Sequence, residues 1–470
     1  MSRAAQHRTA ILRAAIVAVV IVLWRVPPPD GLTPQSWQLF VLFAAAIGSV
    51  VGGAFPILTA SVLSLSAAVL SGLMTPAKAY AGFANATILL IVVAFLAARA
   101  VIKSGLGTRA GHLIVSLFGR STLGLSYSIF LLDGIIAPAF PSNTARAGVL
   151  FPLTFSLTDA AGAKPGDPRY PRLGRFMMYS GIASLSLSSA LWLTAMVANP
   201  LGLEISRGFG IHMAFGSWLI ASSVPTLAGM IILPYVLYRI IGPEITATPQ
   251  APAAARQALQ ALGPLSRQEK VVLAVFAGMV ALWASAAALK VDSTAVAFLG
   301  LGAFLASGVL TLDDIAKEGD VLATFIWFAA LFAMSSELNE LGFMGYLGER
   351  LANRMSGWPM ATAAVTLVLV YVLLHYLFVS QTAHLLALFG VFLDVGVKLG
   401  VPAPLLAFQL LFANNYFSAI TPQGSSANLL FAGSGYLSQK DLYQLGGITT
   451  AFNMALYLLV GTPWLLLVAS

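Results

Sequence analysis

Long apolar segments dominate this chain and recur from near its first residue to its last. Many of them reach the roughly 20 consecutive apolar residues with which an α-helix crosses a bilayer. Only 9% of the 470 residues are charged and 59% are hydrophobic, whereas soluble domains carry about 25% charged residues. Lipid offers no hydrogen-bond partner to the backbone, so these segments must form helices. The sequence therefore predicts an all-α polytopic membrane protein.

The distribution of basic residues predicts the topology. Residues 1–13 carry three arginines and no acid, residues 163–175 carry four basic residues against one acid, and residues 243–268 form the longest polar connection. Basic loops tend to stay in the cytoplasm, so we expect all three there. No Lys or Arg follows Lys440, which favours an external C-terminus. Termini on opposite sides require an odd number of spans, and we expect about eleven.

One polar stretch interrupts the apolar pattern of the first half. Residues 141–152 contain Ser142, Asn143 and Thr144 in succession, with Arg146 two residues later and a proline near each end. Proline lacks a backbone donor and disfavours α geometry in the residue before it, so helix continuity is limited here. The surrounding apolar segment is long enough for a helical piece and a re-entrant hairpin. We expect the motif at the tip of that hairpin.

The second half of the chain repeats this pattern. Ser380, Gln381 and Thr382 follow an apolar run, and His384 takes the place of the arginine. The first copy reads Ser-Asn-Thr-Ala-Arg and the second Ser-Gln-Thr-Ala-His, and their starts are 238 residues apart. Paired polar breaks inside apolar segments indicate a secondary transporter whose site lies where two structural repeats meet.

A weaker pair of polar positions lies downstream of the two motifs. Thr194 leads to Asn199 in the first half and Thr421 leads to Asn428 in the second, each after a run of small residues. Such positions suit broken helices that line a cavity. The alternative is that the two asparagines only cap the helix breaks.

The repeat divides the chain into four parts. Residues 1–35 form an N-terminal cytoplasmic segment and first span, 36–242 the first repeat, 243–268 a cytoplasmic linker, and 269–470 the second repeat. One leading span plus two equal halves gives an odd total, which makes the two halves inverted relative to each other. We expect re-entrant hairpins and broken helices in both halves.

The residue types at the two motifs predict a site for a small anion such as a carboxylate. Arg146 is a fixed positive charge at bilayer depth, where a charge normally faces protein or a cavity. Its planar fork suits both oxygens of a carboxylate. His384 can add a pH-dependent charge, and helix N-termini at hairpin tips favour anions.

Each of these residues also has a purely structural interpretation. The Ser-Asn-Thr run could only join helices, Arg146 could extend to the membrane interface, and His384 could be a satisfied core histidine. Repetition in both halves favours the functional interpretation. His375 and Asp394 beside the second motif are interpreted as structural, and Asp133 is assigned no role.

Several other classes of function are disfavoured. The chain has no cysteine, its five histidines form no close metal pair, and neither a His-Glu-x-x-His nor a Gly-x-Ser-x-Gly string occurs. We therefore expect no enzyme, metal site or cofactor. The net charge of +8 resides mainly in loops, where it sets topology and does not indicate nucleic acid. A channel does not require a paired site that holds an anion.

These motifs resemble the divalent anion/sodium symporter family, which carries di- and tricarboxylates and has a Ser-Asn-Thr motif at two hairpin tips. Residues 142–144 match fully, and residues 380–382 depart by Gln for Asn. The strings at 141–148 and 433–438 are most similar to the exchanger branch. That branch includes bacterial citrate/succinate and tartrate/succinate antiporters and plastid 2-oxoglutarate/malate translocators.

The resemblance implies an architecture and a mechanism. It implies a scaffold domain that mediates homodimers in membrane lipid and a transport domain that moves as an elevator. Each protomer would carry one site between its hairpin tips. In sodium-coupled members two sodium ions bind at the tips and at the following helix breaks, which here lie near 194–199 and 421–428.

Arg146 and His384 favour exchange over ion coupling. A fixed Arg, helped by His, can compensate a dianion without sodium, and an empty carrier would then hold an uncompensated charge that is costly to move through lipid. We expect sodium-independent antiport of dicarboxylates such as 2-oxoglutarate, malate and succinate. The alternative is a sodium- or proton-coupled symporter on the same fold. The Ala-rich composition and the lack of a transit peptide favour a bacterial inner membrane.

Overall fold

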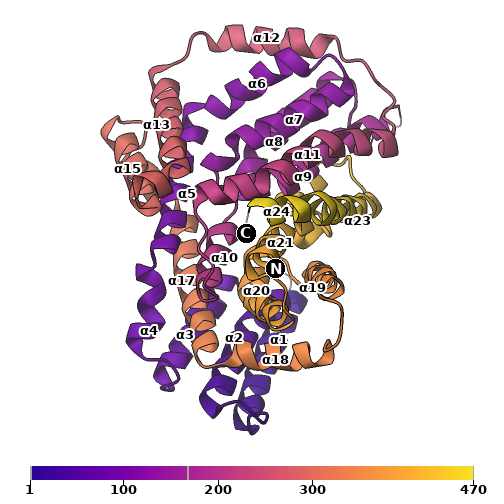
Figure 1. Cartoon of the computed structure of the whole chain (residues 1–470). Coiled ribbons are helices and arrows are strands. Elements are labelled where there is room, and N and C mark those ends of the chain that lie inside the picture. Colours follow the sequence, from indigo (N-terminus) through magenta and orange to yellow (C-terminus); the bar gives the residue numbers. More distant parts are fainter. Residues whose placement is uncertain (1–2, 167–168, 469–470) are drawn as a thin grey trace.

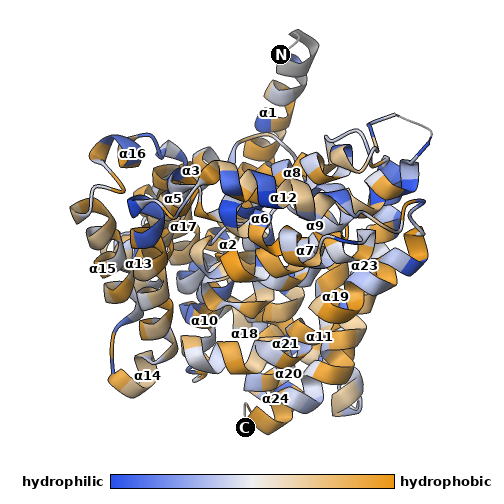
Figure 2. Cartoon of the chain, turned by 90° about the horizontal axis from the view of Figure 1, so that it is seen from above, coloured by the Kyte–Doolittle hydropathy of each residue, from blue (hydrophilic) through white to orange (hydrophobic). Residues whose placement is uncertain are grey.

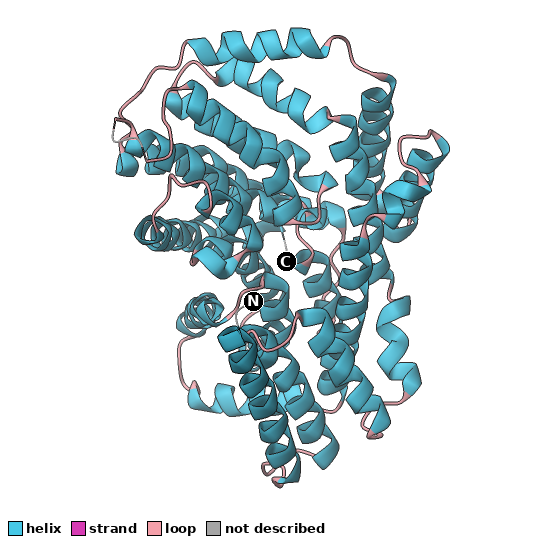
Figure 3. Ribbon diagram, turned by 180° about the vertical axis from the view of Figure 1, so that it is seen from behind, coloured by secondary structure: helices cyan, strands magenta, loops and turns pink. Residues whose placement is uncertain are grey.

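The computed structural model describes residues 3–166 and 169–468. The ends of the predicted first and last segments (1–2 and 469–470) and the one acid of the predicted basic loop, Asp167, lie outside the described residues. Helices make up the regular structure of the described part, apart from an isolated bridge between Ser121 and Ala247 (Figure 3). The predicted all-α class is confirmed.

Seven helical stretches of the described chain are long and apolar enough to cross a membrane. They are Pro34–Val51, Ala86–Ser104, Thr122–Ala139, Phe215–Ile241, Gly319–Glu340, Met360–Leu377 and Gln439–Val468. Hydrophilic residues gather on α12 and α16, whereas the flanks around α11 and α19 are hydrophobic (Figure 2). The total of about eleven spans stays a prediction.

The helices fall into two groups that are interleaved in sequence (Figure 1). The first bundle packs around α5 and α17. Its helices are α1 (Arg3–Arg25), α2 (Pro34–Val51), α3 (Ile57–Leu70), α4 (Pro76–Tyr80), α5 (Ala86–Ser104), α13 (Arg267–Ala284), α14 (Ala286–Leu289), α15 (Ser293–Ala306), α16 (Leu312–Ala316) and α17 (Gly319–Glu340). Ion pairs from Lys103 to Asp314 and from Arg99 to Glu318 join α5 to α16 and to the residue preceding α17.

The second bundle contains both motifs. Its helices are α7 (Thr122–Ile136), α8 (Asn143–Ala160), α9 (Pro171–Leu191), α10 (Ala198–Arg207), α11 (Phe215–Ile241), α19 (Met360–Leu374), α20 (Gln381–Lys398), α21 (Ala403–Tyr416), α22 (Ser426–Ala432), α23 (Gln439–Leu456) and α24 (Thr462–Val468). α7 and α8 are joined by a 3-10 turn, η2 (Ala137–Ala139), and α19 and α20 by another, η4 (His375–Leu377). α7 and α8 therefore form one helical hairpin and α19 and α20 another, and each motif lies at the tip of its hairpin.

Three further helices run between the bundles: α6 (Leu106–Phe118), α12 (Gln250–Leu262) and α18 (Phe343–Arg354). α12 lies along α6, and α18 packs on α20 (Figure 1). The segment 243–268, predicted as a cytoplasmic linker, contains α12. Its Ala, Gln and Leu residues are strong helix formers. Arg109 of α6 ties this segment to α13 through Glu269 at 2.5 Å and the Gly263 carbonyl at 2.8 Å.

Local sequence explains where the main helices start and stop. Thr33 caps α2 with proline in the next position, Asn85 caps α5, and Ser121 caps α7, each by accepting a backbone N–H. These side chains satisfy donors that the first helical turn leaves free. α5 ends at Ser104, and the Gly105 that follows has φ 76°, a left-handed conformation that other residues adopt only at a cost.

Candidate functional site

Both motifs begin a helix, and they do so in the same way. The Ser142 hydroxyl accepts from the backbone N–H of Ala145 at 3.3 Å, and the Ser380 hydroxyl accepts from Ala383 at 3.3 Å. The backbone angles agree, with φ −141° and ψ 125° at Ser142 and φ −143° and ψ 122° at Ser380. α8 and α20 each have 18 residues. Serine at this position holds one free N–H and leaves others at the helix start open.

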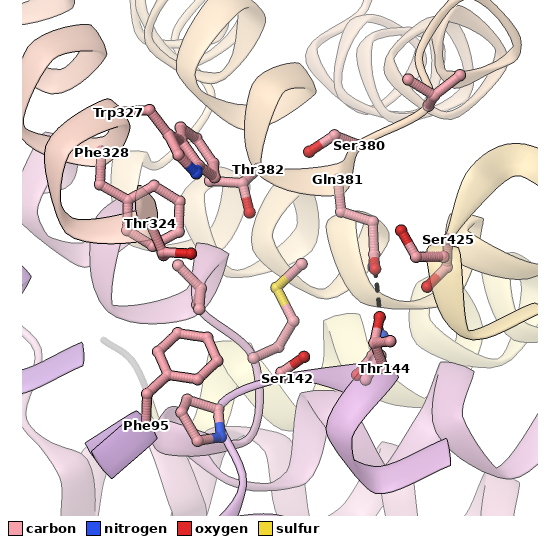
Figure 4. A pocket seen from close by; sticks show the side chains of 16 residues that line it. Phe95, Ser142, Thr144, Thr324, Trp327, Phe328, Ser380, Gln381, Thr382 and Ser425 are labelled. Atoms are coloured by element: carbon pink, nitrogen blue, oxygen red, sulfur yellow. Dashed lines mark hydrogen bonds between the residues drawn. The ribbon is translucent and has the colours of Figure 1, made fainter. Parts of the chain in front are cut away.

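The middle residues of the two motifs bond to each other. Asn143 Nδ2 donates to Gln381 Oε1 at 3.1 Å (Figure 4), and Gln381 Nε2 donates to the Asn414 carbonyl at 2.7 Å. A glutamine is one methylene longer than an asparagine, which lets it span from Asn143 to the backbone of α21. The two tips, 238 residues apart in the chain, therefore meet as the sequence predicts.

Arg146 does not line the cavity between the tips. Its side chain is 0% exposed, and Nη1 lies 3.2 Å from Asp133 Oδ1 of α7, which is also 0% exposed. Nη1 donates to Ser188 Oγ at 2.8 Å, and Nη2 donates to Asn143 Oδ1 at 2.6 Å. The expectation of an uncompensated charge facing the substrate was wrong, because Asp133 neutralises the guanidinium inside the protein.

Asp133 and Ser188 are site residues that the sequence did not reveal. Ser188 Oγ accepts from Arg146 and donates to Asp133 Oδ2 at 2.5 Å, so one hydroxyl connects acid and base. Because Arg146 occupies Asn143 Oδ1, the amide of Asn143 must turn its N–H₂ toward Gln381. The buried ion pair thus fixes the orientation of an amide at the tip. The signal in the sequence was a lone acid in an apolar helix.

His384 is also turned away from the cavity. It is 0% exposed and lies among aromatic rings, with ring centroids 4.3 Å from Tyr371, 4.8 Å from Phe378 and 4.7 Å from Phe417. His375, interpreted as structural from sequence, is 5.3 Å away by centroid and bonds the Gly424 carbonyl through Nε2 at 2.9 Å. His384 therefore packs the first turn of α20 against these aromatic rings and does not line the cavity predicted for the anion.

The downstream asparagines bond to the two helix breaks, which are residues 192–197 between α9 and α10 and residues 417–425 between α21 and α22. Asn199 Nδ2 donates to the carbonyls of Ser189 at 2.8 Å and Trp192 at 3.3 Å. Asn428 Nδ2 donates to the carbonyls of Ser418 at 2.7 Å and Thr421 at 3.1 Å. In both halves the accepting carbonyls lie ten and seven residues before the asparagine. These contacts agree with the alternative that Asn199 and Asn428 cap the helix breaks.

The two threonines do not correspond as the sequence suggested. Trp192, and not Thr194, holds the place of Thr421 in this pattern. Thr194 Oγ1 instead donates to the Pro138 carbonyl at 2.9 Å, which attaches the break to η2. Asn199 Oδ1 accepts from Asn415 Nδ2 at 2.8 Å, so Asn199 and Gln381 both bond to the end of α21.

A cavity of about 280 Å³ lies between the two tips. Its lining residues are Phe95, Pro141, Ser142, Asn143, Thr144, Met196, Val197, Thr324, Trp327, Phe328, Val379, Ser380, Gln381, Thr382, Ser425 and Ser426. All six motif residues line it, and Arg146, His384, Thr194, Asn199, Thr421 and Asn428 do not. Its polar groups are hydroxyls, amides and the indole N–H of Trp327, and the described lining contains no charged side chain (Figure 4).

Comparison with known proteins decides the family. Residues 7–470 match the family described as "Sodium:sulfate symporter transmembrane region". The chain belongs to this family. It is therefore a transmembrane transporter protein and not an enzyme.

Individual relatives align with almost the whole length of this chain. YflS of Bacillus subtilis, whose name proposes malate transport, is 38% identical over 450 residues, covering 95% of this chain and 94% of that protein. The dicarboxylate transporter 2 of spinach chloroplasts is 35% identical, with coverage of 95% and 80%. The citrate/succinate antiporter of Escherichia coli K12 is 30% identical, with coverage of 96% of each.

A solved structure shows the same fold. The crystal structure of the Alcanivorax borkumensis YdaH transporter matches with a TM-score of 0.59 at 14% identity, covering 92% of this chain and 98% of that one. The predicted likeness to the divalent anion/sodium symporters is confirmed by the family match.

We predict that Gln381→Asn weakens anion binding in this cavity by about tenfold and lowers stability by about 1–3 kcal/mol. The shorter side chain cannot reach both Asn143 and the Asn414 carbonyl, and a buried amide group is left unpaired. Isothermal titration with the purified protein measures the affinity, and thermal unfolding measures the stability. Gln409→Asn is a matched control, because Gln409 Nε2 donates to Tyr457 and Thr462 outside the cavity. Equal affinities for both variants would contradict the bridge.

Proposed function

We propose that this protein is a secondary transporter that exchanges dicarboxylates across a membrane. The observation that carries the proposal is the cavity bounded by both Ser-x-Thr tips. Each tip presents a hydroxyl pair at a helix N-terminus, which is the arrangement that binds a carboxylate. Two such tips facing one space suit a molecule with two carboxylates. The names of the spinach and Escherichia coli relatives support the same substrate class.

The positive potential for the dianion comes from backbone and not from Arg146. Asp133 cancels the guanidinium charge, and both side chains are buried. The N-termini of α8 and α20 each contribute about half a positive charge from aligned peptide dipoles. Ser142, Thr144, Ser380 and Thr382 add hydroxyl donors around the same cavity.

The mechanism we propose is an elevator movement of the second bundle against the first. The two hairpins of the second bundle have tips of equal geometry, and their asparagine braces follow one pattern. This supports two inverted repeats, as transporters with midplane sites often have. α1 starts at one end of the molecule and α24 lies at the other (Figure 2), which supports an odd number of spans. The first bundle would be the scaffold of a homodimer in a bacterial inner membrane.

Sodium-independent exchange is supported by the helix breaks. The carbonyls of Ser189, Trp192, Ser418 and Thr421 accept from the amides of the two asparagine braces, at places where a sodium ion would need open oxygens. The Escherichia coli antiporter supports exchange directly by its name. Sodium- or proton-coupled symport is the competing proposal, favoured by the family description.

The test is uptake of labelled succinate, malate and 2-oxoglutarate into proteoliposomes. We expect uptake that requires an internal dicarboxylate and does not change with a sodium or proton gradient. Vesicles without protein give the background. Sodium-driven uptake into empty vesicles would replace exchange by symport. Failure of all three substrates to enter under any gradient would overturn dicarboxylate transport.

A further inference from the structure

One wall of the cavity does not belong to the motif-bearing bundle. Phe95 of α5 and Thr324, Trp327 and Phe328 of α17 close the side opposite the tips. α5 and α17 pack with α3, α13 and α15 in the first bundle. The cavity is therefore assembled from two bodies, the tips of one and a wall of the other.

Trp327 presents a hydrogen-bond donor that the protein leaves unused. Of the seven other indoles, five donate to backbone carbonyls at 2.8–3.0 Å, from Trp37, Trp192, Trp218, Trp283 and Trp464. Across the described residues, the Trp327 indole has no such bond. The ring is only partly buried, and its nitrogen lies on the edge that faces Thr382 (Figure 4). An indole N–H in an apolar wall usually finds a partner.

Thr324 stands one helical turn before Trp327 on the same face of α17. Its hydroxyl points into the cavity (Figure 4), and within the described chain it makes no hydrogen bond to protein. A hydroxyl can donate or accept, whereas an indole only donates. The pair fits an oxygen atom of a ligand, either a carbonyl that accepts from both or a hydroxyl that also donates to Thr324.

The two tips already account for two carboxylates of a bound dianion. We propose that Trp327 and Thr324 form a subsite for the oxygen substituent on the carbon chain between those carboxylates. The inference rests on the proposed function and gives the preferred class as 2-hydroxy and 2-oxo dicarboxylates, over unsubstituted ones. A donor placed for a substrate oxygen disfavours the analogue without it, because the donor then stays unpaired.

The subsite has a second consequence for a carrier with moving bundles. Tips and wall face each other only while the second bundle stands beside α17 as it does here. Discrimination by Trp327 is therefore confined to one face of the membrane. A residue that only supports the fold would change the apparent affinity on both faces alike.

The experiment measures KM for malate and for succinate on each face of proteoliposomes with known protein orientation. Trp327→Phe removes the donor and keeps the ring, and Thr324→Val removes the hydroxyl at similar volume. We expect each to raise the KM for malate about tenfold on one face and not to raise the KM for succinate, which leaves the donor unpaired in the wild type. Trp358→Phe is the matched control, because Trp358 is 46% exposed outside the cavity, and it should behave as wild type.

The outcomes separate this inference from the function beneath it. An unchanged ratio of malate to succinate in both variants overturns the subsite, as does an equal loss for both substrates. Equal effects on the two faces overturn its assignment to the wall of the first bundle. Wild-type protein that carries neither substrate overturns dicarboxylate transport, and the subsite with it.

Discussion

Asp133→Asn is expected to lower the free energy of unfolding by about 3–5 kcal/mol, because it leaves the Arg146 guanidinium buried without its counter-charge. Both side chains are 0% exposed, so solvent cannot replace the lost partner. Arg146→Met should cost a similar amount for the opposite reason, since it strands the carboxylate beside Ser188. Thermal unfolding of the detergent-solubilised protein measures both. A folded Arg146→Met variant with wild-type stability would contradict the pairing.

The double variant Asp133→Asn/Arg146→Met separates stability from transport. With both charges gone, no buried ion is left unpaired, and most of the lost stability should return. Transport should stay low, because Asn143 Oδ1 loses the donor that sets its orientation and its amide no longer has to face Gln381. Recovery of full exchange together with stability would reduce the pair to a structural role.

The features that follow from local chemistry could be predicted. We expected helix N-termini at the hairpin tips, and α8 and α20 begin there, capped by Ser142 and Ser380. Repetition of the motif indicated that the tips would meet, and Asn143 bonds Gln381. The membrane class followed from hydropathy. These predictions needed no knowledge of which helices are neighbours.

The predictions that were wrong depended on partners from other helices. Arg146 has the residue type of an anion ligand, but its guanidinium forms a buried ion pair with Asp133 on α7. His384 is enclosed by Tyr371 and Phe417, which belong to the end of α19 and the turn after α21. Trp327 looks like any aromatic residue of an apolar helix until α17 is placed opposite the tips. Sequence spacing does not encode these contacts.

Linking Thr87→Cys to Glu204→Cys with a short bifunctional thiol reagent is expected to abolish exchange almost completely. Thr87 lies in the first turn of α5 in the first bundle and Glu204 lies on α10 in the second, with 2.9 Å between Thr87 Oγ1 and Glu204 Oε2. A covalent bridge at this contact prevents the sliding that an elevator requires. The chain has no cysteine of its own, so the reagent meets only the introduced pair. Proteoliposome exchange before and after cleavage of the bridge measures the effect.

A second cysteine pair shows whether movement between the bundles is the step that fails. Lys103 Nζ lies 2.6 Å from Asp314 Oδ2, and both residues belong to the first bundle. The protein with Lys103→Cys cross-linked to Asp314→Cys should therefore keep its exchange activity. Loss of exchange in both pairs would point to general damage by the reagent. Continued exchange by the bridged 87–204 pair would show that α10 need not leave α5. The substrate would then have to cross by motion of the hairpin tips alone, against the Asn143–Gln381 bond that joins them.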